Sequence, residues 1–178
     1  YQHDPGSNYQ QDSAWYAPDL VDQILNAKAS HEIGCHTFSH IDFSEHHCSP
    51  ELAEAEISKC KELASAKGIE LRSMVFPGGT EGNHMVLQKQ GFWCYRKPMS
   101  YDVGMPYRDD HGMVAIPSSY GMDKPTYNWS AKTCLKMVKQ FIDKAAKYRM
   151  VCHLWFHPSM DSWYRDKVLP EILHYVDA

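Results

Sequence analysis

Short apolar runs alternate with segments of helical periodicity along this chain of 178 residues. Four apolar runs have the length that is typical of buried strands. They are the stretch leading into His36 and residues 74–76, 92–95 and 150–156. Because strands that alternate with helices usually form a parallel sheet covered by those helices, the alternation predicts an α/β fold.

Five segments have helical periodicity, and two of them carry the clearest signals. Ser49 and Pro50 form an N-cap and first-position pair, which predicts a helix from Pro50 to Gly68. Its inward residues are expected to be Leu52, Ile57, Cys60 and Leu63. A long helix over residues 129–148 is expected to bury Leu135, Val138, Phe141, Ile142 and Ala145. Shorter helices are expected over residues 18–27, over residues 83–90, and near Val168.

The composition indicates a single globular domain over residues 1–178. Hydrophobic residues make up 43% of the chain and charged residues 22%, which suits a protein with a sizeable core and excludes a disordered or fibrous one. The net charge is -4 and the basic residues are scattered, so neither a nucleic-acid surface nor a polyanionic substrate is expected. No apolar run is long enough to cross a bilayer, and the oligomeric state is left open.

The six cysteines lie at positions 35, 48, 60, 94, 134 and 152 and form no Cys-x-x-Cys motif. A thiolate zinc site and a redox motif are therefore not indicated, and isolated thiols favour a reducing, cytoplasmic compartment. The chain begins at Tyr1 and ends at Ala178 within a helical pattern. We therefore expect a fragment whose N-terminal part, with any signal peptide, is missing.

The segment His36-Thr-Phe-Ser-His40 places two imidazoles four residues apart. On one face of a helical turn, such a pair can converge on a single metal ion. A zincin helix would need His-Glu-x-x-His, but the residue four positions after His31 is Cys35, so a metalloprotease is excluded. In a chain with 11 histidines the pair alone is weak evidence, and its interpretation depends on other motifs.

Two further blocks strengthen the interpretation as a metal site. Residues 71–79 contain an apolar run that stops at Pro77 and is followed by glycines, which let backbone N–H groups approach a ligand. Residues 151–157 form another apolar run, which ends in His157. In this order and spacing, the three blocks resemble successive motifs of the polysaccharide deacetylase family, the carbohydrate esterases that share the NodB homology domain. The resemblance extends over most of the chain.

The resemblance implies a distorted (β/α) barrel, here incomplete, with its site at the carboxyl ends of the strands. It also implies a metal-dependent hydrolase that removes N-acetyl or related acyl groups from the amino sugars of a glycan. His36 and His40 would be metal ligands, and zinc is the expected ion. The other site residues implied are His157 as general acid, the backbone N–H of Gly78 as oxyanion donor, and Pro77 and Trp155 as substrate contacts.

Two departures from the family pattern concern charged residues. The family carries an Asp-Asp pair whose aspartates act as general base and third metal ligand, and no such pair precedes His36. The acidic pair at positions 109–110 lies in a polar, turn-like stretch and is expected to be a solvated loop. The family also places an arginine two residues before its proline, where this chain has Val75; Arg72 or Arg96 could supply that charge.

Two other functions stay open at this stage. The chain could be a catalytically inactive, carbohydrate-binding relative, because it lacks the acidic pair. It could instead hold a structural metal, which would need a further ligand such as Cys35 or Cys48. Of the other histidines, His153 is expected to pack within its strand. His84 is expected either to face the site or to follow a helix cap formed by Asn83.

Overall fold

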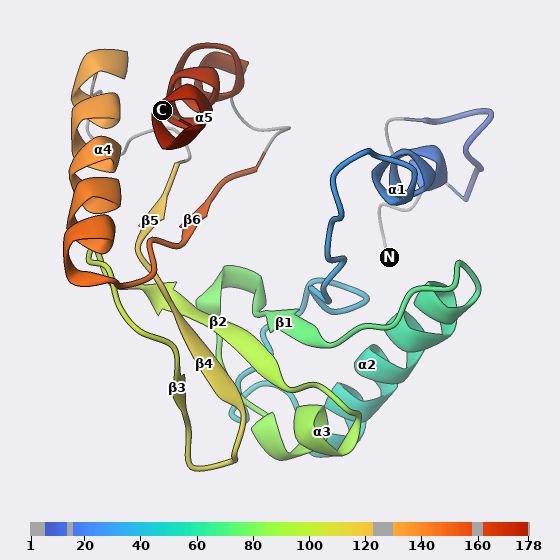
Figure 1. The fold of residues 1–178 in the computed structure, drawn as a ribbon. Helices are drawn as coiled ribbons and strands as arrows, with labels where there is room; N and C mark the ends of the chain where they lie inside the picture. Colours follow the sequence, from blue (N-terminus) through green and yellow to red (C-terminus); the bar gives the residue numbers. More distant parts are fainter. Residues whose placement is uncertain (1–5, 14–15, 123–129, 158–161, 178) are drawn as a thin grey trace.

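The computed structural model describes residues 6–13, 16–122, 130–157 and 162–177, and its main feature is a four-stranded sheet with the order β1-β2-β4-β3 (Figure 1). β1 pairs with β2, and β2 pairs with β4, in parallel, whereas β3 is an antiparallel edge strand. A separate parallel pair joins β5 to β6. The strands are β1 (Ser73–Val75), β2 (Cys94–Met99), β3 (Tyr107–Arg108), β4 (Val114–Ser118), β5 (Tyr120–Gly121) and β6 (Leu154–Trp155).

The parallel pairing confirms the predicted α/β class, while the described strands form two open sheets and not a closed barrel. The two apolar runs that end at site histidines pair less than expected. Before His36, only Cys35 bridges to Met74, and within residues 150–156 only β6 pairs in a sheet. An apolar pattern predicts a buried, extended backbone, but the length of a ladder also depends on the neighbouring strand, about which the pattern carries no information.

Five α-helices accompany the sheets in the described part of the chain: α1 (Pro18–Leu25), α2 (Pro50–Ser65), α3 (His84–Lys89), α4 (Ala131–Tyr148) and α5 (Leu169–Asp177). The predicted start of α2 is confirmed, because the Ser49 hydroxyl accepts a hydrogen bond from the N–H of Leu52 at 3.3 Å. A 3-10 turn (Pro77–Gly79) follows β1, and a π-helical turn (Tyr164–Val168) precedes α5. The predicted first residue of the long helix, Trp129, lies outside the described residues.

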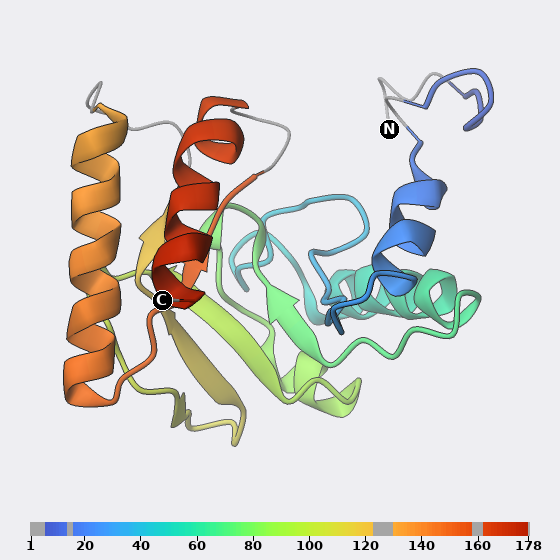
Figure 2. The ribbon, with the colours of Figure 1, turned by 45° about the horizontal axis from the view of Figure 1, so that its top comes forward.

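Figures 1 and 2 show α4 and α5 side by side, with α1 and α2 on the other side of the molecule. Among the helices that the structure describes, none combines the length and the apolar character needed to span a membrane.

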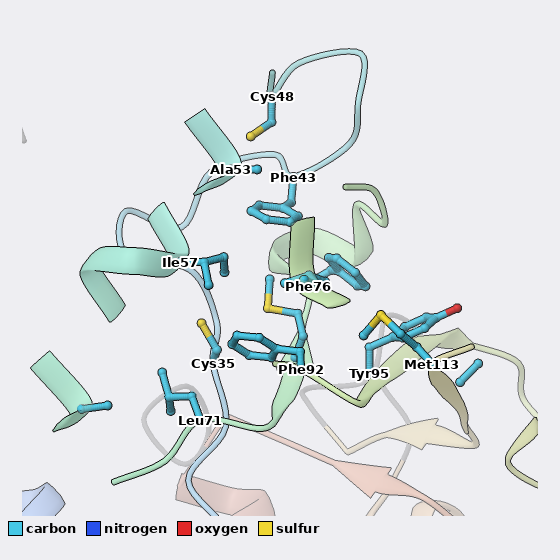
Figure 3. Close-up of a cluster of buried hydrophobic side chains, with 14 residues drawn as sticks. Cys35, Phe43, Cys48, Ala53, Ile57, Leu71, Phe76, Phe92, Tyr95 and Met113 are labelled. Carbon is cyan, nitrogen blue, oxygen red and sulfur yellow. The ribbon is translucent and has the colours of Figure 1, made fainter. Parts of the chain in front are cut away.

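Two clusters of buried apolar side chains hold these elements together. The first joins α2 and α3 to the four-stranded sheet (Figure 3) and includes Phe43, Ile57, Met74 and Phe76. The second joins α4 and α5 to β5 and β6. The predicted stripe of α4 is confirmed: Val138 and Ala145 are buried, and Leu135, Phe141 and Ile142 pack against the second cluster.

The buried face of α2 agrees only in part with the predicted one, because Ile57 is buried and Cys60 packs against the first cluster, but the two leucines do neither. Ala53, Glu56 and Ile57 are buried, whereas Leu52 and Leu63 are 45% and 50% exposed. The small side chain of Ala53 lets the helix approach the core closely, and the larger leucines then lie at the margins of the contact. A prediction based on hydrophobicity alone favours the leucines, and it offers no reason to bury a glutamate.

Candidate active site

A cavity of about 450 Å³ lies where β1, β2 and β6 end. The carboxyl ends of parallel strands are the usual position of ligand sites in open α/β sheets. Five of the six predicted site residues line this cavity: His36, His40, Gly78, Trp155 and His157. The structure thus brings the three sequence blocks together at one place.

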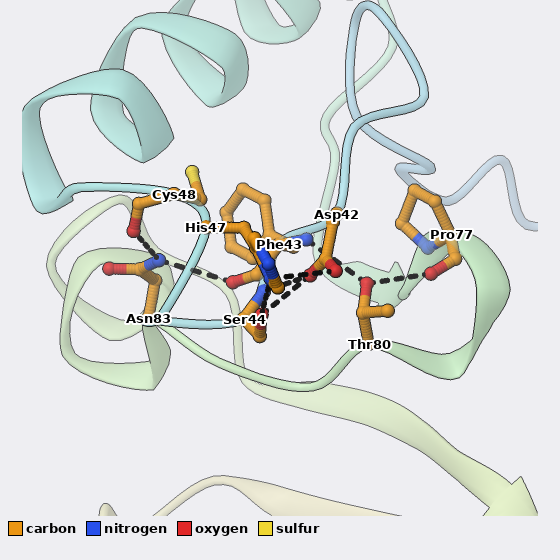
Figure 4. Close-up of polar contacts among 8 residues, drawn as sticks. All are labelled: Asp42, Phe43, Ser44, His47, Cys48, Pro77, Thr80 and Asn83. Atoms are coloured by element: carbon orange, nitrogen blue, oxygen red, sulfur yellow. Dashed lines mark hydrogen bonds and ion pairs between the residues drawn. The ribbon is translucent and has the colours of Figure 1, made fainter.

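Pro77 is the predicted site residue that does not line the cavity, because it is buried within the turn after β1. Its carbonyl oxygen accepts a hydrogen bond from the Thr80 hydroxyl at 2.8 Å. The same hydroxyl oxygen accepts a hydrogen bond from the N–H of Phe43 at 3.0 Å (Figure 4). Pro77 therefore helps to shape a turn that is tied to the loop after His40, and it does not face the site itself.

Asn83 fixes the same loop at a second point. It is the N-cap residue of α3, as expected, but its side chain makes no cap hydrogen bond to that helix. Its Nδ2 instead donates to the carbonyl oxygens of Phe43 and Cys48 at 3.1 and 3.0 Å (Figure 4). Asn83 is 3% exposed, and buried loop carbonyls of this kind need a donor that an amide side chain can supply.

Gly78 has a φ angle of 58°, in the left-handed region that glycine adopts readily and other residues adopt rarely. A residue with a side chain would be strained here. The N–H groups of Gly79 and Thr80 donate to the carbonyls of Phe76 and Pro77 at 3.1 and 3.0 Å. Within the described residues no such bond is found for the N–H of Gly78, which leaves this group suited to a ligand.

His36 has its tautomer fixed by a backbone contact. Its Nδ1 lies 2.7 Å from the carbonyl oxygen of Val75, and because a carbonyl only accepts, Nδ1 carries the hydrogen. Nε2 keeps its lone pair, which is the state in which imidazole binds a metal. Burial lowers the pKa of His36; the Val75 bond opposes this effect, and His40, Arg96 and His157 lower the pKa further. The neutral form that a metal requires is therefore favoured.

His36 and His40 approach each other through an irregular loop, so the predicted helical turn is wrong. Their ring centroids are 4.8 Å apart, and the rings meet edge to face at 79°. Thr37 and His40 have φ angles of 60° and 55°, which belong to the left-handed region. The two imidazoles converge as predicted, but by a different backbone path.

Glu56 of α2 stabilises the loop between His36 and His40. Its Oε2 accepts hydrogen bonds from the N–H groups of Phe38 and Ser39 at 2.9 and 2.8 Å, and its Oε1 accepts one from the Ser39 hydroxyl. The carboxylate is 7% exposed. Sequence reasoning missed this contact, because its donors are mainly backbone groups and no residue pattern marks them.

The Trp155 ring contacts two basic side chains at the cavity. Its ring centroid is 4.6 Å from Cζ of Arg96, and it is 5.3 Å from the ring centroid of His157, which it meets edge to face. Of the two arginines considered as substitutes for the one usual in the family, Arg72 pairs with Glu70 at the surface. Arg96 is therefore the one that brings a positive charge to the cavity.

Lys97 also lines the cavity, which the sequence did not indicate. The pairing of β2 with β4 shifts register between Arg96 and Met99, and such an irregularity lets consecutive side chains reach the same side of a strand. The Lys97 ammonium lies 2.8 Å from the carboxylate of Glu81, and this hydrogen bond raises the pKa of Lys97. No aspartate or glutamate is found among the described residues that line the cavity.

The other histidines considered above lie away from the cavity lining. His153 directly precedes β6 and does not lie within it; it is partly buried, and burial lowers its pKa, as expected for a packed histidine. His84 does not face the site. Its ring packs against those of Phe76, Tyr95 and His111, with centroid distances of 5.6, 4.8 and 5.2 Å.

Within the described ranges, no group of three or more His, Cys, Asp and Glu side chains is placed to hold a metal. Cys35 and Cys48 are both buried and do not line the cavity, so neither supports the structural-metal alternative. Asp109 is not simply solvated: it accepts hydrogen bonds from the Tyr95 hydroxyl at 3.1 Å and from the N–H of Met113 at 2.8 Å. It stabilises the turn between β3 and β4, away from the cavity.

A comparison with protein families adds independent support. A family model described as polysaccharide deacetylase matches residues 6–93, a segment that contains His36, His40 and Gly78. No curated protein matches the chain. The match covers the first two sequence blocks and agrees with the mixed α/β architecture, whereas the third block, residues 151–157, lies outside it. Residues 6–93 of this chain belong to the polysaccharide deacetylase family.

Proposed function

We propose that this protein is a metal-dependent hydrolase that removes N-acetyl or related acyl groups from the amino sugars of a glycan. The family match supports hydrolysis of a carbon–nitrogen bond in a carbohydrate. The observation that carries the proposal is the convergence of His36, His40, Gly78, Trp155 and His157 on one cavity. The cavity volume of about 450 Å³ suits a sugar residue with its acyl group, since small-ligand sites span roughly 300–1,000 Å³.

His36 and His40 are the residues that would hold the ion. The bond from His36 to Val75 leaves Nε2 available, and the two rings lie close enough to act together. Two imidazoles suit zinc and leave positions for a carboxylate, water and substrate. When bound, such an ion supplies Lewis acidity at the acyl carbonyl and a nucleophile at neutral pH.

The chain's own residues serve the remaining steps. The N–H of Gly78 donates a hydrogen bond to the acyl oxygen as that oxygen gains negative charge. His157 protonates the nitrogen of the amino sugar, because an amine leaves poorly without a proton. Trp155 contacts the acyl methyl group through its apolar ring.

The test measures acetate release from N-acetylated amino-sugar oligosaccharides, with zinc or cobalt added and with a chelator. Because no aspartate or glutamate is found among the described residues that line the cavity, we expect turnover to be slow and to need metal, and we expect His40→Ala to lose both metal binding and turnover. His47→Ala is the matched control, because His46 and His47 form a second edge-to-face pair, with centroids 4.7 Å apart, in a loop outside the cavity. Metal binding that survives His40→Ala would remove His40 from the site.

The same assay separates the proposal from the carbohydrate-binding alternative. A protein that binds both metal and oligosaccharide but releases no acetate would be an inactive relative, and the hydrolase proposal would then be wrong. Binding is measured by calorimetry with the same oligosaccharides, so it does not depend on turnover.

A further inference from the structure

We propose that Glu56 is a positioning residue that holds His36 and His40 at the spacing needed for one metal ion. This inference rests on the proposed metal site and assigns a role to a residue outside the cavity lining. Glu56 reaches the loop between the two histidines from α2, a separate element of the fold.

The loop between the two histidines has an unusual backbone conformation. Thr37 and His40 both adopt left-handed φ angles, which are unusual for residues other than glycine and especially so for a β-branched threonine. A backbone of this kind persists only when its surroundings hold it in place. The loop therefore needs contacts from outside, and its central residues, Phe38 and Ser39, are where those contacts occur.

The Glu56 carboxylate is buried, and its hydrogen bonds go to this loop. Glu56 is 7% exposed, and no ion pair to it is found within the described part of the chain. A buried carboxylate is costly unless hydrogen bonds satisfy it, and here all three donors named come from Phe38 and Ser39. Because Oε1 and Oε2 both accept from the loop, Glu56 is placed to orient the loop and not to serve as the third metal ligand.

Helix α2, which carries Glu56, is itself held in place. α2 is fixed at its start by the Ser49 cap and is packed into the first core cluster through Ala53 and Ile57. A carboxylate on a firmly packed helix restrains the position of the groups that it binds. His36 is held on its other side by Val75, so the loop has one anchor on β1 and one on α2.

The experiment compares Co²⁺ binding to the metal-free chain, followed by visible absorption, in four proteins: the wild type, Glu56→Gln, Ser39→Ala and Glu54→Gln. Glu56→Gln removes the charge and replaces one of the two accepting oxygens by an amide NH2, so one oxygen at most still accepts from the loop; such a change in a supporting contact weakens metal sites by about 10–100-fold. Ser39→Ala removes one of the three bonds and is expected to weaken binding less. Glu54→Gln makes the same chemical change on the exposed side of α2 and is expected to leave the affinity unchanged.

Each titration is made at a temperature where thermal unfolding shows the variant to be folded, so that lost stability is not read as lost affinity. Hydrogen exchange of the Phe38 and Ser39 amides in the wild type needs no variant, and we expect both to be protected. If Glu56→Gln does not fold, Ser39→Ala and the exchange rates carry the test. Rapid exchange of both amides, or equal Co²⁺ affinity in folded Glu56→Gln, would overturn the proposal.

Two further outcomes have separate meanings. If Glu56→Gln loses all binding while Ser39→Ala binds as the wild type does, Glu56 is a ligand and the positioning role is wrong. If the wild type itself binds no Co²⁺, the metal site under the proposed function fails, whereas slow exchange of the two amides would still show that Glu56 holds the loop.

Discussion

The guanidinium of Arg96 lies over the indole ring of Trp155, with Cζ 4.6 Å from the ring centroid. This contact joins the middle of β2 to the end of β6, and so links the two sheets at the cavity. The Trp155 ring also lies against Gly121 of β5: a Cβ added at Gly121 would lie 2.6 Å from Cζ2 of the indole. Gly121 thus leaves the space in which the ring sits.

We expect Gly121→Ala to displace Trp155 and to lower kcat/KM for deacetylation by about 10–100-fold, because small misplacements of site residues are costly. Gly121 does not have a positive φ, so the effect is steric. The measurement is a double-mutant cycle with Trp155→Phe, whose smaller ring relieves the clash. Equal losses from Gly121→Ala in both backgrounds would show that the effect does not pass through Trp155.

A second prediction concerns His157. Under the proposed function it protonates the leaving amine as general acid, so His157→Ala should lower kcat by roughly 10²–10⁴-fold without lowering the bound metal content. Ester substrates depend less on this proton and should lose less rate than amides. His153→Ala is the control on the same segment and should lower the free energy of unfolding instead. Equal losses on esters and amides would assign His157 a role in positioning the substrate.

The pH dependence of stability provides a third prediction. The His84 side chain is 13% exposed, and burial lowers its pKa, with His111 adding to the effect. The unfolded chain therefore binds a proton at a pH where the folded protein does not. The contribution of His84 to the free energy of unfolding is present above about pH 6.5, which is the pKa of histidine in the unfolded chain. This contribution is lost as the pH falls through that value toward the lower pKa of the folded protein.

His84→Gln should therefore flatten the fall in the free energy of unfolding below pH 6.5. One histidine contributes at most about 1.4 kcal/mol per pH unit, and part of the slope should remain because burial also lowers the pKa of His36 and His153. Urea unfolding from pH 8 to pH 5 gives the two curves. Curves that stay parallel would mean that His84 binds its proton equally in both states.

The particular elements show what the sequence could predict. The start of α2 was predictable because Ser49 and Pro50 act through local contacts. The buried face of α4 was predictable because a helix that packs against a single core buries the apolar residues of one face. The grouping of His36, Gly78 and His157 followed from the resemblance, which supplied an order of motifs that no local pattern contains.

The features that sequence reasoning missed depend on contacts between distant segments. Glu56 is buried because two backbone N–H groups of a loop need an acceptor, and charge alone would place it at the surface. Lys97 reaches the cavity because the register of β2 shifts, and no residue type marks that shift. The path of the loop from His36 to His40 depends on residues other than glycine that have left-handed φ angles. No sequence pattern marks such residues.

The last prediction tests Asn83, which ties the loop after His40 to the turn before α3. Asn83→Ala should lower the free energy of unfolding by about 2 kcal/mol or more, because it leaves two loop carbonyls without their donor and places alanine at a φ of 50°. Asn83→Gly loses the same donors but tolerates that φ, so it should be more stable than Asn83→Ala by about 1 kcal/mol. Asn83→Asp keeps the shape and faces both carbonyls with an anion, so it should be at least as unstable as Asn83→Ala above pH 5. Urea midpoints for the three variants decide the matter. If Asn83→Asp unfolds at the wild-type urea concentration, the two side-chain bonds do not anchor the loop, and its position must be set by Thr80 alone.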